Sequence, residues 1–205
     1  MKAPTWHGER DVRVDEVPDP KIEKPTDAIV RITTTAICGS DLHLYEVMGP
    51  FMGEGDVLGH EPIGIVEEVG SEVTEIAPGD RVVIPFQMSC GHCYMCDQGL
   101  QTQCETTQVR EQGMGAALFG YTKLYGEVPG GQAEFLRVPQ AQYTHIKVPE
   151  GPRPRSASCT SRTCCPPPGS RWSTPASPTA ARCVCSASAR SATWPRAWRC
   201  TADTA

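Results

Sequence analysis

The sequence predicts a mainly β fold for residues 1–150, arranged as a β-barrel or a β-sandwich. Three observations support this fold class. Short runs rich in valine, isoleucine and threonine recur in this part of the chain, glycine and proline separate them, and no long helical pattern is present. A segment of about 150 residues buries roughly 70% of the surface that its unfolded chain exposes, which is enough for a hydrophobic core.

Six segments carry the strand pattern, and turn-forming residues bound them. Val12 and Val14 alternate with charged residues in the first segment, as in a strand with one buried face. We expect a short helical turn at residues 42–45, a loop at 50–56 and an irregular excursion over 105–131. The predicted strands span residues 10–17, 28–37, 63–70, 81–85, 131–139 and 145–149.

The charge of the chain is unevenly divided. Residues 151–205 contain eight of the 19 basic residues and one of the 24 acidic residues, so residues 1–150 carry a net charge of −12 and the remainder +7. An acidic body argues against nucleic acid or an anionic membrane as a partner. The sequence has no membrane-spanning apolar run and no apolar signal core at its start, so we expect a cytoplasmic protein with reduced cysteines.

The chemistry is concentrated between Cys38 and Glu61. Cys38, His60 and Glu61 offer a thiolate, an imidazole and a carboxylate, which are the ligand types of a catalytic zinc site with an open position. Glu61 either ligates the metal or stands behind it. Asp41 is expected to accept a hydrogen bond from the other ring nitrogen of His60. The alternative for Cys38 or His60 alone is a buried free cysteine and a core histidine.

Ser40 and His43 are the candidate catalytic residues of this segment. A hydroxyl and a base in line can carry a proton from a metal-bound alcohol to solvent. The alternative is that the pair only caps a turn.

A second candidate metal site follows at residues 90–104. Its four cysteines have the spacing C-x2-C-x2-C-x7-C, and four thiolates on one tight lobe close a tetrahedron without an open position, so we predict a structural zinc. An iron–sulfur cluster and disulfide bonds are the alternatives. His92 lies inside the loop and is given no ligand role. The predicted ligands are Cys90, Cys93, Cys96 and Cys104.

The motifs around both sites resemble those of the zinc-containing medium-chain alcohol dehydrogenases. Gly59-His60-Glu61-Pro62-Ile63-Gly64 is similar to the zinc signature of that family, and Cys38-Gly39-Ser40-Asp41-Leu42-His43 is similar to its first-ligand segment. The resemblance implies that residues 1–150 form part of the catalytic domain, a GroES-like β-barrel with a structural-zinc lobe. It also implies that Cys38 and His60 bind the catalytic zinc, that Ser40 and His43 relay protons, and that Asp41 supports His60.

Residues 120–139 resemble the glutathione-independent formaldehyde dehydrogenase branch of this family. The resemblance implies oxidation of a small alcohol or a hydrated aldehyde, with hydride transfer to NAD or NADP and with two zinc sites. The intact family is homo-oligomeric. The alternative function is a zinc-stabilised binding module without chemistry, which would bind zinc only at the four cysteines.

Residues 151–205 do not continue this pattern. They form a low-complexity tail of alanine, arginine, serine, proline and cysteine, with no leucine, isoleucine or phenylalanine to build a core, so we expect disorder. No glycine-rich phosphate loop is visible where the family has its nucleotide-binding domain.

We interpret this tail as a frame-shifted translation that stands in place of the nucleotide-binding domain. Re-reading residues 177–204 two nucleotides along, with free choice of degenerate codons, yields an apolar strand, then G-L-G-P-I-G and a helical pattern, which is the dinucleotide-binding fingerprint in its required context. The same offset turns residues 155–176 into a segment that resembles the one supplying a further catalytic-zinc ligand. The break would lie near residues 151–153. We therefore expect this chain, as written, to be truncated and inactive alone.

Overall fold

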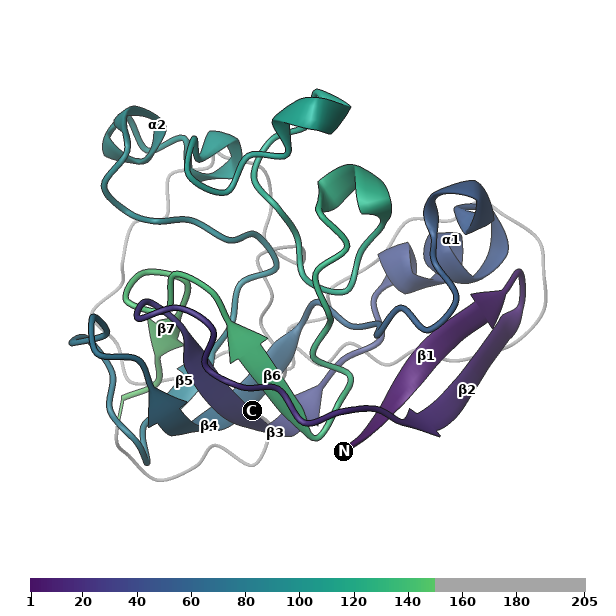
Figure 1. The fold of residues 1–205 in the computed structure, drawn as a ribbon, viewed down its shortest axis with the longest axis horizontal. Coiled ribbons are helices and arrows are strands. Elements are labelled where there is room, and N and C mark those ends of the chain that lie inside the picture. Colours follow the sequence, from purple (N-terminus) through teal and green to yellow (C-terminus); the bar gives the residue numbers. More distant parts are fainter. Residues whose placement is uncertain (150–205) are drawn as a thin grey trace, which may run out of the picture. The chain divides into compact units, whose positions relative to one another are not determined.

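The computed structural model describes residues 1–149, and the predictions made for residues 151–205 lie outside this range. The mainly β class is confirmed, because the strands of two antiparallel sheets contain more residues than the helical segments do (Figure 1). Helical segments are short and lie in the connections between strands.

A two-stranded hairpin begins the chain. β1 (Lys2–Gly8) pairs antiparallel with β2 (Asp11–Glu16), so that Lys2 lies opposite Glu16. The sequence prediction included β2 but missed β1. Proline and glycine interrupt the apolar pattern of β1, and its burial comes from contacts with residues far along the chain, such as the hydrogen bond from the Trp6 amide to the Asp56 carbonyl.

The main sheet has five strands in the order β6-β3-β4-β5-β7, and every neighbouring pair is antiparallel. The predicted strands were placed correctly, but all except the one over residues 63–70 were made too long. The predicted strand over residues 28–37, for example, ends two residues early, and its last residues lead instead toward the first candidate site. The strands are β3 (Ala28–Thr35), β4 (Pro62–Val69), β5 (Arg81–Val83), β6 (Phe135–Val138) and β7 (Ile146–Lys147).

The main core lies on one face of this sheet. Val30 lies opposite Leu136 on one neighbouring strand and opposite Val66 on the other, and all three side chains are buried. Directly opposed residues in a sheet share a face, so these side chains form one apolar row. Val82, Ile84 and Phe119 extend the same cluster. The sheet is thereby fixed in register, because a slip by one residue would expose this row.

The helical segments lie outside the sheets. The predicted turn at residues 42–45 belongs to a longer helix, α1 (Gly39–Glu46), and a second short helix, α2 (Tyr94–Asp97), was not predicted. Over residues 1–149, no helix combines the length and the apolar character needed to cross a membrane. The 3-10 turns are η1 (Gly49–Phe51), η2 (Gln101–Gln103), η3 (Arg110–Gln112) and η4 (Lys123–Tyr125).

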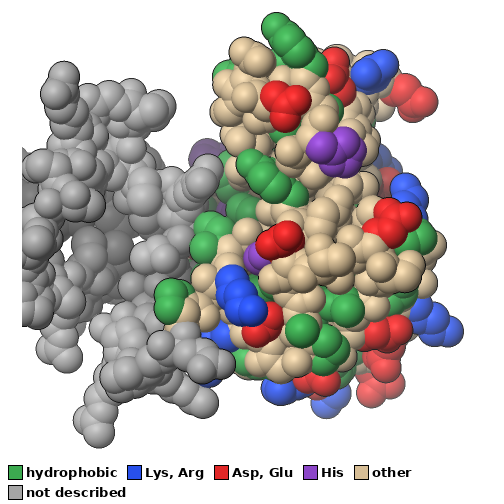
Figure 2. All heavy atoms as spheres, turned by 90° about the vertical axis from the view of Figure 1, so that its left-hand side faces the viewer, with side chains coloured by type: hydrophobic (Ala, Val, Ile, Leu, Met, Phe, Trp, Pro, Cys, Tyr) green, Lys and Arg blue, Asp and Glu red, His purple; other side chains and the backbone are tan. Residues whose placement is uncertain are grey.

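Several apolar side chains reach the surface. Ile37 is 78% exposed and Leu42 is 58% exposed, and both lie beside the first candidate site in the chain. On the face drawn in Figure 2, apolar side chains are scattered among acidic, basic and neutral ones. Scattered apolar side chains of this kind are normal on protein surfaces and define no site on that face.

A histidine links the hairpin to the loop that follows η1. The Nε2 atom of His7 contacts the Asp15 carboxylate, and its Nδ1 atom lies 3.4 Å from Glu54 Oε1. The hydrogen bond with Asp15 raises the pKa of His7 above its ordinary value of 6.5, against the opposing effect of burial. The Thr5 hydroxyl, followed by His7, lowers the pKa of Asp15.

We expect the stability of the chain to fall as the pH rises above 6.5, because a histidine with a raised pKa stabilises the fold while it is protonated. That contribution is complete below the pKa of the unfolded state and is lost as the pH passes the raised folded-state pKa. His7→Asn should remove this part of the pH dependence. Thermal unfolding of both proteins across this pH range measures it, and parallel curves would contradict the assignment.

Candidate metal centres

The first centre lies where β3 ends and β4 begins. Cys38 follows β3 and precedes α1, and His60 and Glu61 directly precede β4. β3 and β4 pair so that Thr35 lies opposite Pro62, which brings the two strand ends together. One ligand atom from each of Cys38, His60 and Glu61 lies within 4.8 Å of the others. The structure thus groups the three predicted ligands.

Asp41 joins the helix to this centre. Its Oδ2 atom accepts a hydrogen bond from the Cys38 amide at 2.7 Å, and its Oδ1 atom lies 3.4 Å from Nδ1 of His60. Asp41 and His60 are both buried, and neither of the two facing atoms has a hydrogen-bond partner within residues 1–149. This contact leaves Nε2 as the ring nitrogen that can serve a metal. Asp41 therefore lies beside His60, but no hydrogen bond joins the two facing atoms, so the predicted hydrogen bond stays a prediction.

The electrostatics of the first centre favour positive charge. Burial lowers the pKa of His60, but Asp41 and Cys38 have the opposite effect, and the balance raises it to about 9. The Asp41 carboxylate and the Cys38 sulfur both favour a positive charge, such as a proton, on this imidazole. A metal ion of charge +2 would replace that proton with the same sign of charge, so the donor set fits the predicted zinc.

Ser40 and His43 lie on α1, three residues apart, and therefore on the same side of the helix. The Ser40 hydroxyl lies 3.8 Å from Cys38 Sγ, and Ser40 is half-buried, whereas His43 is exposed to solvent. Within the described residues no hydrogen bond joins the two side chains. The positions lead from the centre toward solvent, and the proton relay stays a prediction.

Backbone contacts between glycines hold His60 in place. Gly59 has a φ of 103°, and a Cβ atom there would lie 2.3 Å from the Gln132 amide nitrogen. The Gln132 amide donates to the Leu58 carbonyl at 3.0 Å, and the Gly131 amide donates to the Gly59 carbonyl at 2.8 Å. The segment before His60 is thus clamped against residues 130–132.

Two residues beside this centre were missed by the sequence analysis as site residues. Gln132 donates through Nε2 to Asp41 Oδ2 at 3.4 Å and to the Ala36 carbonyl at 3.2 Å. The ring of Tyr121 stands edge-on to His60, with centroids 6.3 Å apart and an interplanar angle of 86°. Burial raises the pKa of Tyr121, so its hydroxyl stays protonated. Both contacts join segments that are far apart in the sequence, and no short sequence pattern predicts them.

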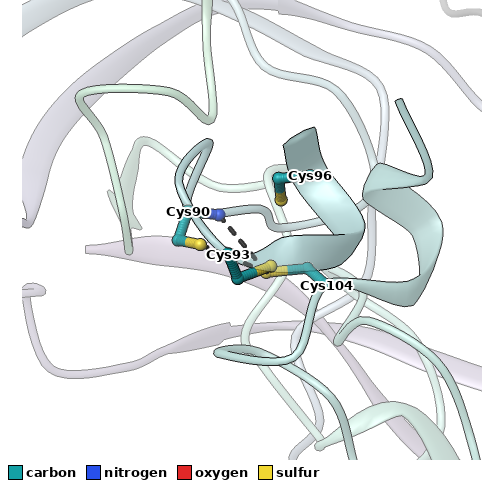
Figure 3. Close-up of side chains that lie close together, drawn as sticks. All are labelled: Cys90, Cys93, Cys96 and Cys104. Carbon is teal, nitrogen blue, oxygen red and sulfur yellow. Dashed lines mark hydrogen bonds between the residues drawn. The ribbon is translucent and has the colours of Figure 1, made fainter. Parts of the chain in front are cut away.

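The second centre brings the four predicted cysteines together around α2 (Figure 3). The Sγ atom of Cys104 lies 3.6 Å from that of Cys90 and 3.9 Å from that of Cys93. Four sulfurs at about 2.3 Å from a tetrahedral zinc would be about 3.8 Å apart, whereas a disulfide bond is about 2.05 Å long. These two separations fit a tetrahedral site, the other sulfurs lie within 4.8 Å of one another, and all five cysteines of residues 1–149 are free.

Hydrogen-bond donors surround these sulfurs. The Cys90 amide donates to Cys104 Sγ and the Glu105 amide to Cys93 Sγ, each at 3.4 Å, while the Thr106 hydroxyl donates to Cys90 Sγ at 3.1 Å. For Cys104, hydrogen bonds from Thr107 and nearby amides outweigh burial and lower the pKa to about 6. Burial instead raises the pKa of Cys96 to about 12. Donors that stabilise thiolates, packed this closely, fit a bound cation.

Comparisons with known proteins identify the domain. Residues 24–150 match the family model described as the alcohol dehydrogenase GroES-like domain. An uncharacterised zinc-type alcohol dehydrogenase-like protein, AdhB of Bacillus subtilis, is 55% identical over 150 residues, which is 73% of this chain and 39% of that protein. The glutathione-independent formaldehyde dehydrogenase of Pseudomonas aeruginosa is 40% identical over 145 residues, which is 67% of this chain and 35% of that protein.

A solved structure of an alcohol dehydrogenase is also similar to this chain. Alcohol dehydrogenase TADH from Thermus sp. ATN1 is 39% identical and superposes with a TM-score of 0.65, over 73% of this chain and 40% of that one. The chain thus spans well under half the length of the relatives that it matches. The predicted resemblance to zinc-containing alcohol dehydrogenases, and to the formaldehyde dehydrogenase branch, is confirmed. This chain belongs to the alcohol dehydrogenase GroES-like domain family.

Proposed function

We propose that this chain carries the metal-binding part of a zinc-dependent alcohol or aldehyde dehydrogenase, whose intact form transfers hydride from an alcohol or a hydrated aldehyde to NAD or NADP. One observation carries this proposal. Cys38, His60 and Glu61 offer three zinc-type ligand atoms within 4.8 Å of one another, in a domain of the alcohol dehydrogenase GroES-like family. The proposed substrates are small molecules, and the proposed location is the cytoplasm.

The roles of the residues follow from their positions. Cys38 and His60 would hold a catalytic zinc, with Glu61 as a further ligand or directly behind it. A zinc ion bound there would act as a Lewis acid and lower the pKa of a substrate hydroxyl toward neutrality. Asp41 lies 3.4 Å from Nδ1 of His60, and a hydrogen bond formed there on metal binding would leave Nε2 for the metal. Catalysis of this kind needs the open coordination position that three protein ligands leave.

Ser40 and His43 would carry the proton away. Ser40 is half-buried beside Cys38, and His43 is exposed three residues along the same helix. A proton taken up at the Ser40 hydroxyl would pass to His43 and then to solvent, either directly once substrate is bound or through a water molecule. The cysteines at residues 90, 93, 96 and 104 would hold a second zinc with a structural role.

We also propose that residues 151–205 are a frame-shifted translation in place of the nucleotide-binding domain. This segment has no glycine-rich phosphate loop, so the chain as written should bind zinc without reducing NAD or NADP. Sequencing the gene across codons 145–160 tests the frame. A restored frame that encodes G-L-G-P-I-G would give a chain to assay with alcohols and aldehydes, and the recorded frame standing unchanged would contradict a sequencing error as the origin of this segment.

Metal stoichiometry tests the proposed centres in the chain as it exists. We expect two zinc ions per chain in the wild type and one in both Cys38→Ala and His60→Ala, because each change removes a ligand of the first centre only. Elemental analysis after dialysis measures this. Leu42→Ala is a matched control at an exposed position on α1 and should retain both ions. A single zinc ion per wild-type chain would contradict the dehydrogenase proposal and would fit a zinc-stabilised binding module instead.

Activity provides the second arm of the test. The wild-type chain as written and Cys38→Ala should give the same background rate of NAD or NADP reduction with alcohols and aldehydes. A rate in the wild type above that of Cys38→Ala would contradict the proposed inactivity, while a frame-restored chain should show turnover that Cys38→Ala abolishes.

A further inference from the structure

The ring of Tyr121 contacts the candidate metal ligand His60 from a segment far along the chain. The two ring centroids lie 6.3 Å apart at an interplanar angle of 86°, and Tyr125 stacks edge-on against Tyr121 at 5.6 Å and 75°. Edge-to-face pairs at these separations are favourable and directional. The three rings therefore form a series that ends on the buried imidazole.

The backbone places Tyr121 there with little freedom. A Cβ atom on Gly120 would lie 2.4 Å from the Gly59 carbonyl oxygen, so the residues before Tyr121 and before His60 are packed backbone to backbone. Tyr121 is partly buried and packs against the cluster that contains Trp6, Leu44 and Leu58. The tyrosine ring is fixed by this packing and is not a mobile surface group.

The imidazole of His60 is constrained from two directions. Oδ1 of Asp41 lies 3.4 Å from Nδ1, a contact at one edge of the ring without a hydrogen bond between the two atoms. Rotation about the Cβ–Cγ bond turns the plane of the imidazole, and the contact with the Tyr121 ring, at an interplanar angle of 86°, opposes that rotation. Metal-binding histidines depend on such outer contacts for their orientation.

We propose that Tyr121 is a positioning residue, whose ring holds the imidazole of His60 in the plane that directs Nε2 toward Cys38 and Glu61. This role rests on the proposed metal centre, but it requires metal binding only and no turnover. The aromatic ring carries the role, and the hydroxyl does not. Tyr125 contacts the Tyr121 ring and supports it, so a change at Tyr125 should weaken metal binding less than a change at Tyr121.

Cobalt(II) is the probe, because its visible absorption reports the ligand geometry of each occupied centre. Titration of the full chain with Co²⁺ alone should show two centres, and the spectrum lost in His60→Ala defines the first. We expect Tyr121→Leu to weaken Co²⁺ binding at that centre by about tenfold and to shift its spectrum. Tyr121→Phe should restore wild-type affinity and spectrum. Phe51→Leu, an aromatic-to-leucine change at a 41% exposed position outside both centres, is the matched control.

The outcomes separate this role from its alternatives. Wild-type affinity and spectrum in Tyr121→Leu would overturn the positioning role and leave the metal centre intact. Equal losses in Tyr121→Phe and Tyr121→Leu would also overturn it, because the hydroxyl would then matter. A wild type with cobalt only at the four cysteines would overturn both this inference and the proposed function. If Tyr121→Leu does not fold, Tyr125→Leu replaces it, with a weaker loss expected and no loss contradicting the role.

Discussion

Replacing Cys93 by serine should unfold the lobe of residues 90–104 and should remove one zinc ion per chain. The apolar cluster in this lobe consists of Cys90, Cys96, Cys104 and Ala116, with Cys93 packed against them. No large aliphatic or aromatic side chain belongs to that cluster, so the proposed zinc ion would supply the stability that an apolar core supplies elsewhere. Structural zinc binding contributes on the order of 10 kcal/mol or more to folding such units.

Hydrogen exchange of the backbone amides measures this effect locally. We expect Cys93→Ser, and the wild type after treatment with a strong chelator, to lose protection over residues 90–104 while the strands of the main sheet keep theirs. Cys38→Ser is the matched control, since it changes a cysteine of the first centre and leaves the lobe protected. Unchanged protection of the lobe in the chelated wild type would show that the cysteines hold their positions without metal.

Replacing Gly59 by alanine should cost about 3–5 kcal/mol of unfolding free energy. The residue has a φ of 103°, and its new Cβ atom would lie 2.3 Å from a backbone nitrogen and 2.4 Å from Cγ of Gln132. Backbone cannot move aside as a flexible side chain can. A shift of Gln132 would also disturb its hydrogen bond to Asp41, so metal binding at the first centre should weaken too.

Gly79 is a close control for this substitution. It has a φ of 97°, but a Cβ atom there would meet nothing within 4 Å. Gly79→Ala should therefore carry only the conformational penalty of about 1–2 kcal/mol. Chemical denaturation of both variants, with a zinc titration alongside, measures the difference. Equal losses in the two variants would mean that the packing of Gly59 against Gln132 has no energetic role.

The candidate ligands could be predicted because they are encoded by residue type and short spacing. These residue types and spacings indicate metal binding without knowledge of the fold. They are four cysteines within one lobe, and Cys38 followed by His60 and Glu61. Fold class could be predicted for a similar reason, since strand patterns and turn residues are local. Strand ends were less accurate, because the sheet register and not propensity decides where pairing stops.

The supporting residues could not be predicted in this way. Gln132 reaches Asp41 across 91 positions of sequence, and Tyr121 reaches His60 only because the backbone at Gly120 packs against Gly59. β1 was missed because its partners include Asp56 and Glu134, which are distant in the chain. Such contacts follow from tertiary packing, and one sequence carries no separate signal for them.

The different sequence separations of the two centres set an order of assembly. Cys90 and Cys104 are 14 positions apart and need only a short loop to close around an ion, at a small entropic cost. Cys38 and His60 meet only after β3 and β4 have paired and after residues 130–132 have packed against Gly59. Non-local pairing of this kind is slow. If both centres bind zinc as proposed, the cysteine lobe would therefore be able to bind its ion before the main sheet is complete, whereas the first centre would bind only after the sheet has formed.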